Sequence, residues 1–170
     1  MPPTHWLWYF VPLLPLVTRL FLCLNCYKVM HQVPPEEAQE RDVNRSFILS
    51  LAGFSFTAVA GFAVLDATTR IALQLPTWYV LLSFVSYIST LNAQSYKTNR
   101  LQNQVATALV EIGTLSLMLS LIALLFSASF SCKFQWIAAT ITFGAWLIDH
   151  VLRLRFDYHF LRVLVSKLPP

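Results

Sequence analysis

Hydrophobic and polar positions of this chain alternate in long blocks rather than residue by residue. The longest apolar block covers residues 105–128, and about 20 apolar residues are enough for a helix to cross the hydrocarbon core of a bilayer, roughly 30 Å thick. The preceding stretch, residues 92–104, is rich in amides and contains two cations, so it does not enter a bilayer. The pattern predicts membrane-spanning helices joined by short polar loops. It disfavours a barrel, whose strands alternate apolar and polar residues.

The same blocks predict an all-α integral membrane protein, a bundle of four transmembrane helices with a further hydrophobic helix at the amino terminus. We expect the whole chain, residues 1–170, to form a single polytopic membrane domain. Its last part, residues 153–170, is expected to be an amphipathic cytoplasmic tail that lies on the membrane surface. The expected spans, in chain order, are residues 6–27, 46–66, 77–96, 105–128 and 134–152.

The first of these segments contains residues that a spanning helix usually lacks. Pro12 and Pro15 lie near its start, where a missing amide costs a helix least. Arg19 lies inside it, and we expect this long side chain to extend toward the nearer membrane surface. An interfacial or re-entrant course is the alternative to full spanning. Because the first ten residues contain no Lys or Arg, the segment is not expected to be a cleaved secretory signal.

Composition agrees with the membrane assignment. Hydrophobic residues make up 56% of the chain and charged residues 12%, whereas about 25% of the residues of a soluble domain are charged. The connections between the apolar blocks are short, so they leave no room for a separate soluble domain. Three cysteines do not provide a disulfide framework.

Cations divide unequally between the two expected sides of the membrane. Arg70 and Lys133 lie on one side. All the other cations outside the spans lie on the opposite side, which the positive-inside rule makes cytoplasmic. We therefore expect an integral protein of the cell or inner membrane with its carboxyl terminus in the cytoplasm, and a tail whose cations contact anionic headgroups. The cations on the cytoplasmic side are Lys28, Arg41, Arg45, Lys97, Arg100, Arg153, Arg155, Arg162 and Lys167.

Small residues recur at four-residue intervals in the second span, at Gly53, Thr57 and Gly61. Such a row lets two helices approach closely in lipid. Packing against another helix of the same chain is the favoured interpretation, and a seam between two copies is the alternative.

Glu111 is the strongest candidate for a functional residue, because an ionisable group inside a span is costly and by default indicates a pathway, a relay or a binding site. Thr107 and Thr114 share its helical face. A pathway or gating role is one interpretation. The other is a structural carboxylate that is hydrogen-bonded to Tyr87, Thr90 or a loop amide. The polar stripe expected to face Glu111 from the third span includes Ser83, Tyr87 and Thr90.

Cys23, Cys26 and His31 have a spacing that suits metal ligands, but a structural zinc site needs four ligands and the sequence offers no convincing fourth. They are therefore weak candidates, and no metal is expected; acylated or unmodified cysteines are the alternatives.

A second group of ionisable residues lies at the end of the last span. Asp149, His150 and Arg153 could form a metal or phosphate site. A basic helix on anionic headgroups, with Arg155, is the favoured interpretation.

No catalytic signature is present: the chain lacks the G-x-x-x-x-G-K-[ST], H-E-x-x-H and G-x-S-x-G motifs. We therefore expect a small multi-pass protein that acts by assembly, as a homo-oligomeric pore or membrane effector, without a cofactor. The first alternative is a non-catalytic accessory subunit of a larger membrane complex. The second is a membrane enzyme that uses Asp149, His150 and Arg153. The expected partners are the lipid bilayer and either further copies of the chain or another membrane protein, and not nucleic acid.

Overall fold

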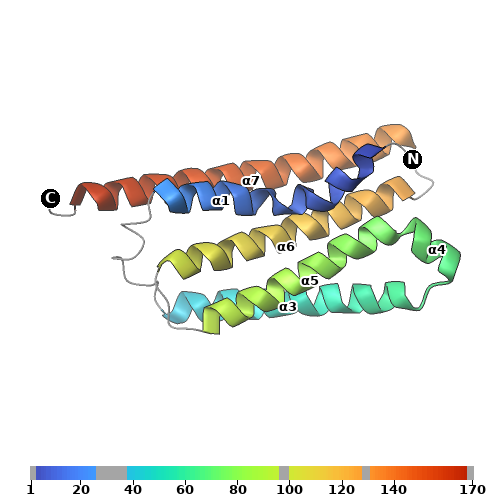
Figure 1. The fold of residues 1–170 in the computed structure, drawn as a ribbon, viewed down its shortest axis with the longest axis horizontal. Helices are drawn as coiled ribbons and strands as arrows, with labels where there is room; N and C mark the ends of the chain where they lie inside the picture. Colours follow the sequence, from blue (N-terminus) through green and yellow to red (C-terminus); the bar gives the residue numbers. More distant parts are fainter. Residues whose placement is uncertain (1–2, 26–37, 96–99, 128–130, 168–170) are drawn as a thin grey trace.

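A computed structural model describes residues 3–25, 38–95, 100–127 and 131–167, and these residues form helices without any strand. The expected all-α class is confirmed. The helices run back and forth along one long axis, so that successive long helices are antiparallel (Figure 1). The elements are η1 (Pro3–Leu13), α1 (Leu14–Asn25), α3 (Ala38–Ala63), α4 (Ala67–Ala72), α5 (Gln74–Ser95), α6 (Arg100–Ser127) and α7 (Cys132–Lys167).

Within the described residues, three helices are long and apolar enough to cross a membrane: Arg45–Ala63 of α3, Gln104–Ser127 of α6 and Cys132–Arg155 of α7. The amino-terminal segment contains a shorter apolar helix, Leu7–Leu22. Helix α5 covers the expected third span, but it is not among the three. Its apolar run is interrupted by Ser, Thr, Asn and Gln residues.

Helices α5 and α6 form the centre of the bundle. Helix α3 packs against α5, while η1, α1 and α7 pack against α6. Two clusters of buried side chains hold these layers together, one around Tyr79, Leu115 and Trp146 and the other around Ile48 and Tyr87. Helices α3 and α7 lie at the edges, and their outer faces carry large exposed apolar side chains.

The amino-terminal segment is a 3-10 helix up to Leu13 and an α-helix after it. Pro12 has no N–H, so it cannot bond the carbonyl of Trp8 in α geometry or that of Tyr9 in 3-10 geometry. Side chains at the start of α5 bond these two carbonyls instead. The Tyr79 hydroxyl donates to the Trp8 oxygen at 2.9 Å, and the Trp78 indole donates to the Tyr9 oxygen at 3.4 Å. The carbonyls that Pro12 leaves free thus accept hydrogen bonds that connect this segment to α5.

Helix α7 does not end where the last span was expected to end. It continues without a break to Lys167, so residues 153–167 prolong the spanning helix in the same direction (Figure 1). The expected tail is helical and continuous with the last span, and its position on the membrane surface stays a prediction. The physical reason lies in the sequence: no Gly or Pro occurs between Gly144 and Pro169, so nothing ends the helix earlier.

The row of small residues faces outward. Gly53, Thr57 and Gly61 are exposed, and no atom lies within 4 Å of a Cβ built on either glycine. The favoured expectation, packing within the chain, is therefore not met among the described residues. The close approach occurs at Gly113 of α6, where a Cβ would lie 2.7 Å from the ring of Tyr87 on α5.

Candidate functional site

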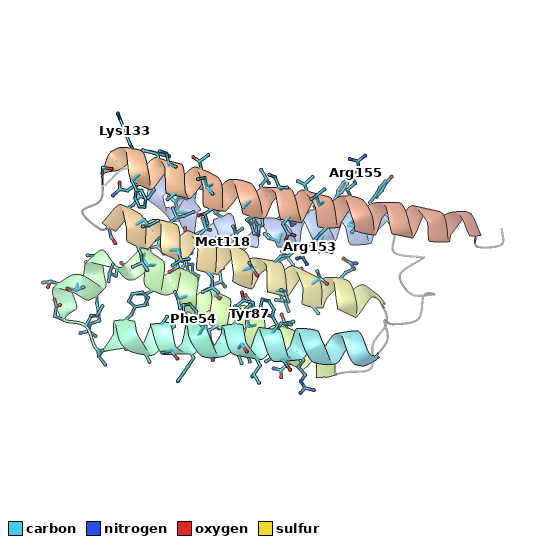
Figure 2. The ribbon with its side chains drawn as sticks, turned by 180° about the vertical axis from the view of Figure 1, so that it is seen from behind. Phe54, Tyr87, Met118, Lys133, Arg153 and Arg155 are labelled. Carbon is cyan, nitrogen blue, oxygen red and sulfur yellow. The ribbon has the colours of Figure 1, made fainter. Side chains whose placement is uncertain are left out.

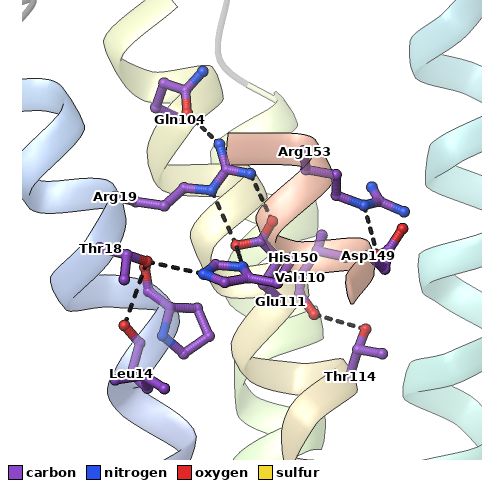
Figure 3. A network of polar contacts seen from close by, with 11 residues as sticks. Leu14, Thr18, Arg19, Gln104, Val110, Glu111, Thr114, Asp149, His150 and Arg153 are labelled. Carbon is purple, nitrogen blue, oxygen red and sulfur yellow. Dashed lines mark hydrogen bonds and ion pairs between the residues drawn. The ribbon is translucent and has the colours of Figure 1, made fainter. Parts of the chain in front are cut away.

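Polar side chains from three helices meet in a buried group that we call the polar cluster: Thr18 and Arg19 of α1, Gln104 and Glu111 of α6, and His150 of α7 (Figure 3). The antiparallel course of the helices brings these residues to one level of the bundle, although up to 132 positions separate them in sequence. Glu111 lies seven residues after Gln104, which is about 10 Å along the helix from the start of the α6 span.

An ion pair between Arg19 and Glu111 is the centre of the polar cluster. Arg19 Nε lies 3.0 Å from Glu111 Oε2, and Nη2 lies 2.6 Å from Oε1, so the guanidinium binds both carboxylate oxygens. A third guanidinium nitrogen donates to the side-chain oxygen of Gln104. The Arg19 and Glu111 side chains are only 2% and 7% exposed. The expectation that Arg19 extends to the membrane surface is therefore wrong, because Glu111 provides a buried counter-ion.

His150 is the third ionisable member of the polar cluster. Its Nε2 lies 3.1 Å from the hydroxyl of Thr18, and its Nδ1 lies 3.2 Å from Glu111 Oε2. On its other side, the ring is stacked on the indole of Trp146, with centroids 5.0 Å apart and planes at 9°. Trp146 and His150 are one turn apart, so the face of α7 that packs on the bundle carries both.

The expected group of Asp149, His150 and Arg153 is divided between two faces of α7. His150 turns into the bundle, whereas Asp149 and Arg153 form an i,i+4 ion pair of 2.8 Å on the outside, with side chains more than half exposed. Figure 3 shows the His150–Glu111 pair and the Asp149–Arg153 pair on opposite sides of α7. The geometry brings His150 to Glu111 and separates it from the residues expected to act with it.

Ser83, Tyr87 and Thr90 of α5 form hydrogen bonds with groups other than Glu111, contrary to one expectation. Tyr87 pairs with Thr114 at 3.3 Å between the oxygens, and Ser83 pairs with Ser55 of α3 at 3.0 Å. Thr90 donates to backbone carbonyls. These bonds join α3, α5 and α6 in a second polar layer.

Other predicted site residues are only partly described. Thr107 is half-buried on α6, one turn before Glu111. Cys26 and His31 lie outside the described residues, as do the side chains of Cys23, Arg162 and Lys167. Within the part of the chain that the structure describes, no group of three His, Cys, Asp or Glu residues could hold a metal ion.

Two residues of the polar cluster, Arg19 and His150, were not predicted to contact Glu111. A signal for the pairing with Arg19 does exist in the sequence: both charges lie inside expected spans, a short distance from the end that was expected to be cytoplasmic. No family model, curated protein or solved structure matches this chain. The arrangement itself therefore carries the functional argument: a neutralised buried ion pair with a titratable imidazole beside it.

Proposed function

We propose that five helical segments of this chain cross the membrane, with the carboxyl terminus in the cytoplasm. Helix α5 runs antiparallel between α3 and α6, and its 22 residues extend about 33 Å, which is enough to cross a hydrocarbon core of roughly 30 Å. The Pro3–Asn25 segment packs along α6 in the same way. Both segments thus pack on protein neighbours along one side of the bundle.

The ends of the bundle differ in charge and in aromatic content. Lys133 lies at one end of α7, while Arg153 and Arg155 lie toward the other (Figure 2). The Lys133 end also holds Trp136 and the contact between Tyr9 and Trp78, whose rings are 6.1 Å apart. Tryptophan and tyrosine gather at both membrane interfaces, so they mark this end of the bundle as an interface, whereas cations gather on the cytoplasmic side. This distribution supports the proposed orientation.

We further propose that the protein acts by lateral association, as a non-catalytic subunit of a larger membrane complex. The observation that carries this proposal is that the buried polar groups of the polar cluster and of the second polar layer, apart from His150 Nδ1, are bonded within the described part of the chain. Glu111 is held by Arg19, and the Ser55–Ser83 and Tyr87–Thr114 pairs join neighbouring helices. The outward surfaces of the edge helices α3 and α7 are largely apolar.

A self-assembled pore is the second candidate function. The outward row of Gly53, Thr57 and Gly61 favours it, because such a row suits close contact between two parallel helices, and copies in one membrane share their orientation.

Purification of the full chain from its native membrane, followed by measurement of its stoichiometry and of ion flux in liposomes, tests the two functions. The accessory role predicts a fixed ratio to a larger membrane protein and no flux from the isolated chain. A discrete homo-oligomer that conducts would refute it and support a pore. If the outward row is the interface between copies, Gly61→Ile should disrupt the homo-oligomer. Gly144→Ile is the matched control, because its Cβ also meets open space but lies on α7, outside the row, and it should leave the homo-oligomer intact.

The proposed orientation has its own test. Cys132 is exposed beside Lys133, at the end opposite to the carboxyl terminus. In a variant with Cys23→Ser and Cys26→Ser, a membrane-impermeant maleimide should label Cys132 in intact cells. Labelling only after the membrane is opened would refute the orientation.

A further inference from the structure

The hydroxyl of Thr18 determines which nitrogen of His150 carries a proton. Thr18 Oγ1 lies 2.9 Å from the Pro15 carbonyl oxygen, to which it donates its only proton. The same oxygen lies 3.1 Å from His150 Nε2, so there it acts as an acceptor. The ring must then carry a proton on Nε2. A neutral imidazole has one N–H, and this arrangement leaves Nδ1 with a lone pair only.

That lone pair faces a carboxylate. Nδ1 of His150 lies 3.2 Å from Glu111 Oε2, a separation that permits an ion pair but does not form a hydrogen bond as the atoms stand. Among the buried side-chain nitrogens and oxygens that the structure describes, this atom alone has no hydrogen-bond partner. Two acceptors in contact repel each other and leave a buried polar atom unsatisfied. One additional proton between them removes both costs.

The groups around His150 are suited to hold that proton. From α6, Glu111 supplies the negative charge. From α1, Arg19 binds the same oxygen at 3.0 Å and neutralises the carboxylate, so the added proton brings the cluster to a net charge of +1. On α7 itself, Asp149 pairs with Arg153 on the outer face. The indole of Trp146 covers the ring, and an aromatic face attracts a cation.

We propose that the polar cluster is a proton-binding site inside the membrane, with one proton held between Glu111 Oε2 and His150 Nδ1. The proton comes from water at the cytoplasmic end of the bundle, and its binding forms a hydrogen bond between α6 and α7. The proposal rests on the proposed membrane course and orientation of the chain, but not on its proposed role as a subunit of a larger complex.

Nuclear magnetic resonance of the full chain in liposomes, with histidine ring nitrogens labelled, tests the site from about pH 8 to pH 5, where a histidine ordinarily changes charge. His150 is identified by its contact with the Trp146 indole and by the loss of its signals in His150→Gln. We expect either a ring with protons on both nitrogens or a bare Nδ1 bonded to a protonated Glu111. Infrared absorption of the Glu111 carboxyl group, absent in Glu111→Gln, separates these two forms, and both support the proposal. A neutral ring beside an ionised Glu111 over the whole range, whichever ring nitrogen carries the proton, would overturn it.

Thr18→Val provides a second test, since it removes the acceptor that keeps the proton on Nε2. The ring of this variant should shift to the neutral form with its proton on Nδ1, a form that the wild type does not show. Asp149→Asn is the matched control, because it changes the neighbouring charge on the outer face and should leave the His150 signals unchanged. If Thr18→Val does not fold, the wild-type spectra still decide the question.

Discussion

Replacing Glu111 by glutamine would leave the Arg19 guanidinium buried without its counter-ion. Removing one partner of a buried ion pair costs about 3–5 kcal/mol. Glutamine keeps one acceptor oxygen for the guanidinium, and a hydrogen bond to a charged group is worth about 1.5 kcal/mol. Its amide group, however, presents N–H donors where the second carboxylate oxygen accepted a bond at 2.6 Å. The expected loss in the free energy of unfolding is therefore roughly 1.5–3.5 kcal/mol.

Reversible unfolding of the purified protein in mixed lipid–detergent micelles measures this loss. The matched control is Asp149→Asn, which breaks the exposed pair with Arg153 one position from His150. An exposed i,i+4 pair is worth only about 0.3–0.5 kcal/mol. Adding Arg19→Met to Glu111→Gln removes the orphaned charge, so the double variant should be more stable than Glu111→Gln alone. If Glu111→Gln is as stable as Asp149→Asn, or if Arg19→Met gives no recovery, the ion pair does not hold α1 on α6.

Two other regions of the fold give sharp expectations. Gly113→Ala places a methyl group 2.7 Å from the ring of the fully buried Tyr87 and should lower the free energy of unfolding by about 1–3 kcal/mol in the same assay. Gly53→Ala is the control, because its methyl group meets open space and should not lower this free energy. Equal effects of the two substitutions would refute the close approach of Gly113 and Tyr87. Hydrogen bonds from the side chains of Thr68 and Thr69 and from the Thr69 amide lower the pKa of Asp66, the residue that caps α4. Because the folded pKa is lower than the unfolded one, the contribution of this carboxylate is complete above the ordinary aspartate range and is lost as the pH falls through the lowered value. Protection of the Thr69 amide from hydrogen exchange should decline in acid in the wild type and be low at every pH in Asp66→Ala; protection that is unchanged in that variant would contradict the role of the cap.

The sequence by itself determined the helical class and the membrane environment of this chain. A helix of about 20 consecutive apolar residues matches the hydrocarbon core of a bilayer. In lipid, a helix forms all of its backbone hydrogen bonds internally. The positions of the main helices follow from these blocks, since each helix covers an expected span. Glu111 was also recognised as exceptional from the sequence alone, because a charge inside a span needs a partner.

Only the tertiary structure decided which partner that is. Hydropathy assigns a depth to each residue but not the side of the helix that meets a given neighbour, and the rotation of α1, α6 and α7 about their axes is set by packing. That rotation brings Arg19 and His150 to Glu111 and turns Asp149 away. It also turns the row of small residues outward, where its spacing alone had suggested a contact within the chain. Local periodicity therefore defined the helices, whereas long-range contacts between them defined the site.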